Sequence, residues 1–568
     1  MRSFATTSTA AVCLFLAGCS DAPTANVGSQ SEAVRSITRA EAIADFDQVV
    51  TSFRSLYGAL ERKEARYGFR FDALAAQYRA RVEAARGETE YRRIFQEFIA
   101  RFKDAHISLT ADLISDDAHA FGLPFRVMPV GDTFVVYEAA AGSPIHVGDE
   151  LLSIDGHSAS DLSNSFSPWV GIPNALAARH FTAAMLTSRP VYAAEGLRAN
   201  ERVQVQLRND RGVERAETVT WQEVPRLLPV VPAAPVAGGA GPRAAMAVSR
   251  ETAEVARAEL SKLGDRVPFF MTDAVRAALG VAGEVAPGRV ALAQFGLTPQ
   301  DAAAIHFFAA TYSLGRKKVL LVRIPSYLQA DAALNYLRAL FVEQQPQVDA
   351  LVLDQTHNPG GSVGFAEGVL SLLAPRRING FVERMHADRL WIQTFANAAK
   401  GARQVNPADP TVAILEGRAH DIDAAYSANR PLSIPIPLSL EPTIEPDSVH
   451  WAKPLVLLAD ELSVSCADIV PLILKANGVA TLFGQTTMGG GGNVETVATL
   501  ANTQAVLSVS RGLGTVYDPT GQYPERNVIE DNGVAPDVAY SHTLADFRAG
   551  YVGYVRAFND ALAARVGR

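Results

Sequence analysis

A serine lies where the sequence changes from a strand pattern to a helix pattern. Residues 454–458 predict a buried strand and residues 469–475 predict a helix, with the small-residue run Ser463-Val-Ser465-Cys466-Ala467 between them. A serine in such a turn is exposed beside the free N–H groups of the first helical turn. Acyl-transfer enzymes place a nucleophile beside an oxyanion hole in this way. A plain helix N-cap would show the same local pattern, so Ser465 needs further support.

A second turn could supply oxyanion donors. The strand pattern of residues 350–354 leads into Asn358-Pro-Gly360-Gly361. Because glycine has no side chain, a substrate can approach the main chain closely there. Gly360 and Gly361 are therefore candidates for the oxyanion hole, with the backbone amide of Cys466 as a further donor. An ordinary Pro-Gly turn is the alternative interpretation.

Two further residues have side chains that could activate the serine. His106 follows a helical segment, and a neutral histidine is the usual base for a serine nucleophile. Glu530 precedes the turn Asn532-Gly533-Val-Ala-Pro536-Asp537 and could orient an imidazole. Each signal is weak alone, because the chain has eleven histidines and acidic turns are common.

These turns occur together in an order that resembles a known family. Asn-Pro-Gly-Gly after a strand, then Ser-x-Ser, then Gly-x-x-Thr-x-Gly-Gly, then Glu-x-x-Gly-Val-x-Pro-Asp are similar to the serine peptidases of the C-terminal-processing-protease and tricorn-core family. The resemblance covers about residues 315–545. It implies a serine peptidase with a catalytic domain of the ClpP/crotonase-like type.

The resemblance also selects between two catalytic schemes. The C-terminal-processing branch uses a lysine at the position that is Gly490 here, so a Ser–Lys dyad is not expected. The tricorn-like branch uses a histidine and a glutamate, and His106 and Glu530 occupy the matching places. The implied triad is Ser465, His106 and Glu530. Several tricorn-like members carry a serine before the histidine; here it is Ala105, which leaves the Glu530–His106 link direct, water-bridged or broken.

The N-terminus predicts export and a lipid anchor. Arg2 precedes an apolar stretch that ends in Leu16-Ala17-Gly18-Cys19, and this stretch is too short to span a bilayer. The four residues resemble the bacterial lipobox, in which the cysteine is lipidated. Of the three cysteines, only Cys466 would then remain as a free thiol, so no intrachain disulfide is expected. The predicted location is the bacterial cell envelope, with the protein otherwise soluble.

The length of 568 residues predicts several domains in an α/β multidomain fold. We expect a signal peptide (1–19), a tether (20–36), a helical bundle of three helices carrying His106 (37–115), a PDZ-like β-rich domain (116–225), a linker or insertion of unassigned role (226–300), the α/β catalytic domain (301–545) and a C-terminal helix (546–568). The PDZ-like assignment rests on Gly148-Asp149 and Asp155-Gly156, which stand at the turns that the PDZ core requires.

The sequence thus predicts an exported, lipid-anchored serine endopeptidase that acts on proteins or peptides. No metal or organic cofactor is expected. The net charge of −8 and the absence of a basic run argue against a nucleic-acid partner. The sequence does not decide between a monomer and a homo-oligomer. The alternative function is a non-catalytic peptide- or lipid-binding protein on the same fold. An esterase is disfavoured because no Gly-x-Ser-x-Gly motif surrounds Ser465.

Overall fold

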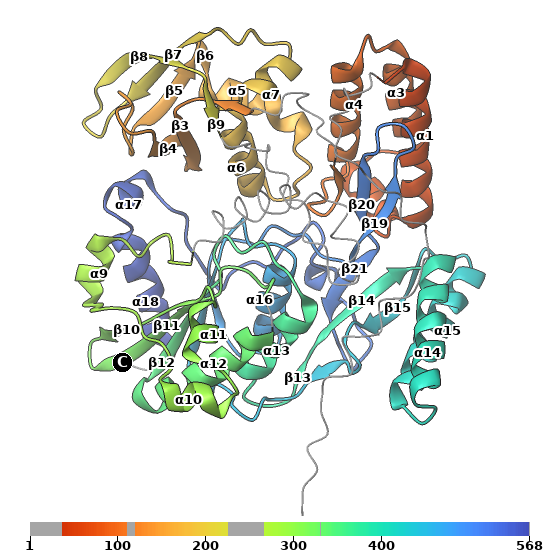
Figure 1. The fold of residues 1–568 in the computed structure, drawn as a ribbon, viewed down its shortest axis with the longest axis vertical. Coiled ribbons are helices and arrows are strands. Elements are labelled where there is room, and N and C mark those ends of the chain that lie inside the picture. Colours follow the sequence, from red (N-terminus) through yellow and green to blue (C-terminus); the bar gives the residue numbers. More distant parts are fainter. Residues whose placement is uncertain (1–36, 111–119, 225–265, 330, 567–568) are drawn as a thin grey trace, which may run out of the picture.

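The computed structural model describes residues 37–110, 120–224, 266–329 and 331–566. Helices and sheets are arranged in several units around one larger α/β unit (Figure 1), so the predicted α/β multidomain fold is confirmed. The signal peptide, the tether, Cys19 and most of the predicted linker lie outside the described residues. No helix within the described ranges is long and apolar enough to cross a membrane.

A six-stranded sheet forms the centre of the α/β unit. Its strands stand in the order β10-β11-β12-β17-β18-β22, antiparallel between β10 and β11 and parallel elsewhere. Their bounds are β10 Phe308–Leu314, β11 Lys317–Arg323, β12 Ala350–Asp354, β17 Leu455–Ala459, β18 Thr481–Gly484 and β22 Val538–Ala539. The neighbouring strands β12, β17 and β18 end just before the three glycine- and serine-containing turns. Their carboxyl ends therefore bring those turns to one edge of the sheet, where α/β proteins bind ligands.

Helices cover both faces of this sheet. Successive residues of a strand point to opposite faces, so Leu351 and Leu353 pack on one side while Ala350 and Val352 pack on the other. The first face is covered by α10 (Arg289–Gln294), α12 (Asp331–Gln344), α13 (Val363–Leu373) and α16 (Cys466–Ala476). The second is covered by α9 (Asp273–Leu279) and α18 (Val552–Val566). Burial on both faces explains the nearly continuous apolar runs of the parallel strands.

The N-terminal unit contains four helices where the sequence predicted three. They are α1 (Arg39–Leu56), α2 (Leu60–Tyr67), α3 (Phe71–Ala84) and α4 (Glu88–Ala100). The unpredicted helix, α2, has the sequence Leu-Glu-Arg-Lys-Glu-Ala-Arg-Tyr and ends at Gly68 in the left-handed conformation. It lacks the apolar spacing of the other three. The unit packs on β19 (Val494–Thr499) and β20 (Val506–Ser510) of the α/β part, as Figure 1 shows.

The β-rich unit spans residues 120–224. Its main sheet runs in the order β3-β4-β5-β7-β8, with the short β6 (His157–Ser158) beside β5. The strands are β3 Phe125–Val130, β4 Thr133–Ala139, β5 Glu150–Ile154, β7 Arg202–Arg208 and β8 Glu214–Thr220. Helices α5 (Ala159–Phe166), α6 (Ala175–Met185) and α7 (Arg189–Ala194) complete the unit. Asp155 and Gly156 have positive φ angles of 46° and 82° at the predicted turn, and β3 is an edge strand.

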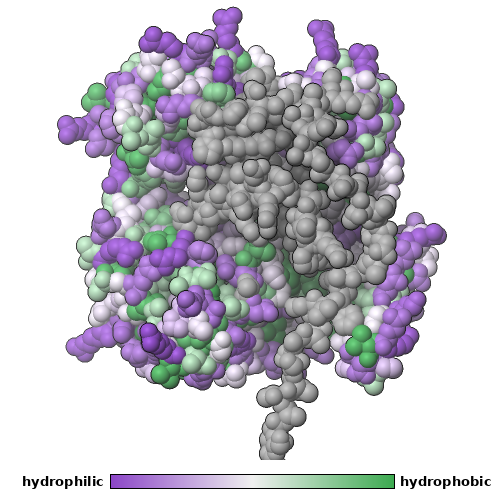
Figure 2. Space-filling model, in the orientation of Figure 1, coloured by the Kyte–Doolittle hydropathy of each residue, from purple (hydrophilic) through white to green (hydrophobic). Residues whose placement is uncertain are grey.

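Two further features differ from the sequence expectation. A helical hairpin of α14 (Arg389–Val405) and α15 (Pro410–Ser427) projects from the α/β unit between β14 (Phe381–His386) and β15 (Leu432–Pro437). Its outer surface is mainly hydrophilic (Figure 2). At the C-terminus two helices, α17 (Leu544–Arg548) and α18, replace the single predicted helix. Gly550 and Tyr551, with φ of 64° and 65°, break the helical path between them.

Candidate active site

Ser465 stands in a strained turn between β17 and α16. Its φ of 63° and ψ of −119° are unusual for a residue with a side chain. The sharp strand-to-helix turns that expose nucleophilic serines have the same kind of strain. The turn is held by its neighbours, because the Val464 N–H donates to the Asn358 carbonyl at 3.1 Å and the Met488 N–H donates to the Ser463 carbonyl at 2.8 Å. The backbone therefore presents Ser465 at the carboxyl edge of the sheet.

Asp468 fixes this turn from inside helix α16. Its carboxylate accepts the Ser465 N–H at 2.9 Å, the Thr487 hydroxyl, and the N–H groups of Gly489 and Gly490 at 3.1 and 3.2 Å. Burial raises the pKa of Asp468 to about 7, although these donors oppose the rise. Asp468 therefore joins the serine turn to the Thr487–Gly490 turn and has a structural role.

The Gly360 backbone lies directly against the serine. A Cβ at Gly360 would stand 2.6 Å from the Ser465 Cβ and 3.0 Å from the Cys466 nitrogen, so only glycine fits. The Gly360 N–H itself donates to the Asn358 side chain at 2.8 Å. Within the described ranges, the N–H groups of Gly361 and Cys466 donate to no hydrogen-bond acceptor. These two amides are the available donors beside the serine.

The Cys466 thiol is directed away from this chemistry. Its sulfur is buried and donates to the Gly361 carbonyl at 3.2 Å. Burial raises the pKa of Cys466 to about 12, so the thiol stays protonated at neutral pH. A protonated buried thiol is a poor nucleophile.

His106 is positioned by the segments on either side of it. The preceding residues leave α4, and the following ones form β1 (Ser108–Thr110), which pairs with β20. The Asp104 carboxylate accepts the His106 backbone N–H at 2.8 Å. The histidine is only 2% exposed. Burial lowers the pKa of His106, Lys63 lowers it further and Asp104 opposes them. The imidazole is therefore neutral at pH 7, as a general base must be.

Gly490 is the point where the histidine and the serine turn meet. A Cβ at this residue would lie 2.8 Å from Val464 Cγ2, 3.2 Å from the Ala105 Cβ and 3.6 Å from His106 Cε1. A longer side chain at position 490 would therefore collide with Val464 and the histidine segment. Glycine at position 490 thus lets the serine turn and the histidine segment pack closely, with Val464 and Ala105 as the nearest neighbours.

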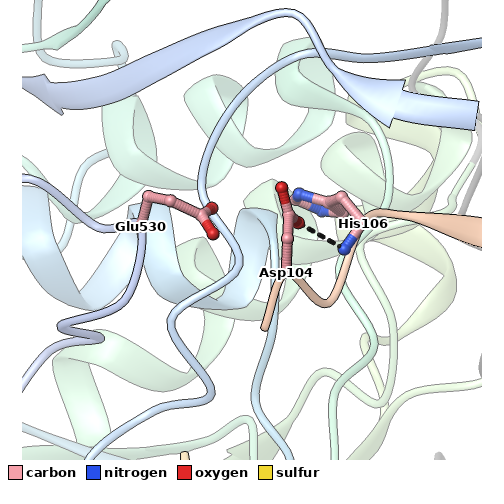
Figure 3. Close-up of side chains that lie close together, drawn as sticks. All are labelled: Asp104, His106 and Glu530. Atoms are coloured by element: carbon pink, nitrogen blue, oxygen red, sulfur yellow. Dashed lines mark hydrogen bonds between the residues drawn. The ribbon is translucent and has the colours of Figure 1, made fainter. Parts of the chain in front are cut away.

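Glu530 approaches His106 but does not bond to it. The Asp104, His106 and Glu530 side chains each place a nitrogen or oxygen within 4.8 Å of the others, and Figure 3 shows Asp104 between the other two. In the described part of the chain, neither ring nitrogen of His106 has a hydrogen-bond partner. A direct bond from Glu530 or Ser465 to the ring is thus absent from this structure. Catalytic hydrogen bonds commonly tighten only when substrate binds.

Both nearby carboxylates are engaged by other groups. Glu530 accepts the Lys63 ammonium at 2.5 Å and the Gly491 N–H at 3.1 Å. Asp104 accepts the hydroxyls of Tyr57 and Ser510 at 2.9 and 3.0 Å. Two carboxylates and an imidazole resemble a metal donor set, but the Lys63 ammonium already supplies a cation against Glu530 and would repel a second one.

A cavity of about 720 Å³ lies away from these side chains, between the β-rich unit and the α/β unit. One wall is formed by β3 and α6, and the other includes Glu461 and Leu462, which precede the serine turn. His180 of α6 and Glu461 are 2.9 Å apart across the two units. The cavity therefore adjoins the segment that precedes the serine turn.

Comparison with known proteins agrees with this geometry. Residues 318–540 match peptidase family S41. That segment contains both glycine turns, Ser465 and Glu530. Residues 318–540 are a peptidase family S41 domain. The chain therefore carries an S41 peptidase domain and is a serine peptidase.

Similar proteins cover nearly the whole chain. A protein of Chlamydia pneumoniae is 25% identical over 570 aligned residues, which cover 92% of this chain and 90% of that one. The structure of mature CPAF has a TM-score of 0.71 at 21% identity and covers 93% of this chain and 98% of its own. CPAF complexed with lactacystin gives 0.71 at 20% identity, covering 93% and 99%. These structures share the fold of this S41 peptidase.

Sequence reasoning missed the charged groups that surround His106 and Glu530. Lys63 lies on the unpredicted helix α2, and Asp104 precedes His106 by two residues. The Lys103-Asp104-Ala105-His106 spacing was a usable signal for Asp104. Nothing local indicated Lys63, since its two carboxylate partners are more than 460 positions away.

Proposed function

We propose that this S41 peptidase is an exported, lipid-anchored endopeptidase that uses Ser465, His106 and Glu530 as its catalytic triad. The observation that supports it most is the strained Ser465 turn. Gly360 lies against this turn beside the candidate oxyanion amides of Gly361 and Cys466, and Gly490 lies between the turn and the neutral His106. A non-catalytic binding protein has no need for a strained serine beside a buried imidazole.

The chemistry follows from the protonation states. The Ser465 hydroxyl attacks the scissile carbonyl while His106 takes its proton, and a tetrahedral intermediate forms. The Gly361 and Cys466 amides stabilise its oxyanion, with Gly360 shaping the turn. His106 then protonates the leaving amine, and water hydrolyses the acyl-enzyme by the same steps. Loss of one oxyanion donor in such a site costs about 100- to 1,000-fold in rate.

Glu530 stabilises the imidazolium that forms in each step. It is fully buried, and its carboxylate lies within 4.8 Å of His106 and Asp104. A negative charge at this distance in a dry site favours the protonated ring. We assign Glu530 this electrostatic role because both carboxylate oxygens are already held, by Lys63 and by Gly491.

The substrates we propose are extended peptide segments. Among the strands that the structure describes, none pairs with the outer side of β3, and this edge lines the 720 Å³ cavity together with α6. An extended peptide can add to such an edge, which is how PDZ domains bind their ligands. This arrangement supports the PDZ-like interpretation of the β-rich unit.

Active-site labelling tests the triad. A fluorophosphonate probe is added to purified residues 20–568 and to the variants Ser465→Ala, His106→Ala and Glu530→Gln. We expect the wild type to be labelled, the first two variants to lose labelling and Glu530→Gln to react more slowly. Ser463→Ala is the matched control, because its hydroxyl bonds Asp460 and Gln355 inside the turn. A folded wild type that never reacts would favour the binding-protein alternative.

Lipid attachment is tested separately in cells. The full chain and a Cys19→Ser variant are expressed in a bacterium supplied with a palmitate analogue that can be detected after gel separation. Export with lipidation at Cys19 predicts incorporation into the wild type alone, and recovery of the wild type with membranes. Equal incorporation, or none, would contradict the anchor.

A further inference from the structure

Lys63 is a fully buried lysine that neither the motifs nor the proposed mechanism uses. Its side chain is 0% exposed, and a buried ammonium is costly unless every N–H has a partner. Its three donors go to the Lys103 carbonyl at 2.9 Å, to Glu530 at 2.5 Å and to Asp531 at 2.6 Å. An ammonium has three donors, so Lys63 is completely satisfied.

Each of these acceptors belongs to a segment that positions a catalytic group. Lys103 lies three residues before His106, and Glu530 and Asp531 form the turn after the 3-10 helix Glu525–Asn527. Helix α2 holds the same turn at two more points. Arg62 donates to Asp531 at 2.8 Å and to the Glu530 carbonyl at 2.8 Å, and the Tyr67 hydroxyl donates to Asp531 at 2.8 Å. One short helix therefore joins the histidine segment to the glutamate segment.

The charges around Glu530 give Lys63 a second effect. The pKa of Glu530 lies well above its usual value: burial raises it most, Asp104 and Asp531 raise it further, and the Lys63 charge and hydrogen bond only partly oppose them. Burial lowers the pKa of Lys63, but Glu530, Asp104 and Asp531 outweigh burial and keep the amine protonated. The titratable and charged groups that face Glu530 are Lys63, Asp104, Asp531, His106, Tyr57 and, at its carbonyl, Arg62.

We propose that Lys63 is a positioning residue of the peptidase, whose ammonium favours the anionic form of Glu530 beside His106 and fixes the spacing of their two segments. The proposal rests on the proposed triad. Lys63 touches neither the substrate nor the reacting atoms and acts through Glu530. Both Glu530 oxygens are occupied, by Lys63 and by Gly491, so the carboxylate acts on His106 through its charge.

The pH dependence of kcat/KM for a fluorogenic peptide tests the proposal. Activity requires an ionised Glu530 and a neutral His106. Lys63 lowers the pKa of both groups, so Lys63→Met raises both values. The acidic limb of the profile should therefore move to higher pH. A shift of one pH unit lowers activity about tenfold on that limb, and raising the pH should restore part of the loss.

Two control variants separate charge from packing. Asp531→Asn removes a negative charge that raises the pKa of Glu530, so its acidic limb should move to lower pH. Tyr67→Phe removes a hydrogen bond of the same network without changing charge, so its limb should stay in place. In the Glu530→Gln background, Lys63→Met should cost no further activity, because the group through which it acts is gone.

Each outcome decides the matter. A Lys63→Met profile with the wild-type acidic limb, measured on protein whose near-ultraviolet circular dichroism is native, overturns the proposal. The proposal is also overturned if Lys63→Met lowers activity by the same factor in the Glu530→Gln background as in the wild type. If Lys63→Met fails to fold, the opposite shift in Asp531→Asn still tests the electrostatic effect. An inactive wild type would instead contradict the triad itself, so the two failures are distinguishable.

Discussion

The two halves of the site are built in different ways. The serine half comes from one sheet edge, where the ends of β12, β17 and β18 bring Gly360, Ser465 and Gly490 together. The acid–base half comes from segments far apart in the chain: His106 follows α4, Glu530 lies more than 420 positions later, and Lys63 of α2 joins them. Local backbone geometry makes the first half, and a buried ion network makes the second.

This difference predicts different sensitivities. The serine turn is supported by main-chain contacts of the neighbouring strand turns and by one buried carboxylate, Asp468. The histidine and the glutamate depend on buried charges, and removing one partner of a buried pair leaves the other uncompensated. Substitutions far from Ser465 should therefore affect the acid–base half before they affect the serine half.

The strongest test removes one residue from each half. Ser465→Ala and His106→Ala should each lower kcat by about 10⁴- to 10⁶-fold, because neither group works without the other. For the same reason the double variant should be no slower than either single variant. Steady-state hydrolysis of a fluorogenic peptide measures all three. A double variant much slower than both singles would mean that the halves act independently.

Gly490→Ala disturbs the contact between the halves. The new Cβ would stand 2.8 Å from Val464 and 3.2 Å from Ala105, which forces the histidine segment away from the serine turn. A displacement of about 1 Å at a catalytic group can cost about 100-fold in kcat.

Gly417→Ala is the matched control, because this exposed glycine inside α15 has open space around it. It should raise the free energy of unfolding by about 0.5–1 kcal/mol and leave kcat unchanged. Near-wild-type kcat in Gly490→Ala would show that the close packing at Gly490 is not needed to position His106.

Arg62→Met weakens the acid–base half alone. It deletes two hydrogen bonds from α2 to the Glu530 turn while Lys63 remains. We expect a loss of about 1–3 kcal/mol in the free energy of unfolding, since Asp531 loses one partner of a largely buried pair. A fall of about tenfold in kcat/KM should accompany it, with labelling by a fluorophosphonate slowed but still at Ser465. Denaturant unfolding and peptide hydrolysis measure the two effects. Unchanged values would mean that α2 does not support the site.

Arg54→Met should have the smallest effect of these substitutions on stability and activity. Arg54 pairs with Asp72 at 2.6 Å, but the two side chains are 55% and 81% exposed. Water and salt screen such a pair, so the free energy of unfolding should change by less than about 1 kcal/mol. Activity should not change. A large loss of activity in this variant would show that the N-terminal helices act on the site through their surface as well as through Lys63.

The sequence predicted the turns of the serine half because their signals are local. Strand patterns that end in glycine and serine turns predicted the α/β sheet, and the structure places those turns on three neighbouring strands. The position of Ser465 relative to Gly360 follows from that topology. Even so, the positive φ of Ser465 could not be read from the residues, because a strained angle depends on the contacts that hold the turn.

The acid–base half was only partly predictable. His106 and Glu530 were found by resemblance, whereas α2 was missed because Lys63 is one of five charged residues among its eight. Its stability comes from ion pairs to distant residues, which leave no apolar period in the sequence. The break between α17 and α18 was missed for a related reason, since Tyr551 adopts a positive φ that its residue type does not predict.

The most direct measurement identifies the residue that a fluorophosphonate modifies. Wild-type protein and His106→Ala are treated with the probe, digested and analysed by mass spectrometry of the peptides that carry residues 463–466. The account predicts one adduct, on Ser465, in the wild type and none in His106→Ala. An adduct on Ser463 or on a serine elsewhere, or equal labelling of Ser465 without the histidine, would contradict it.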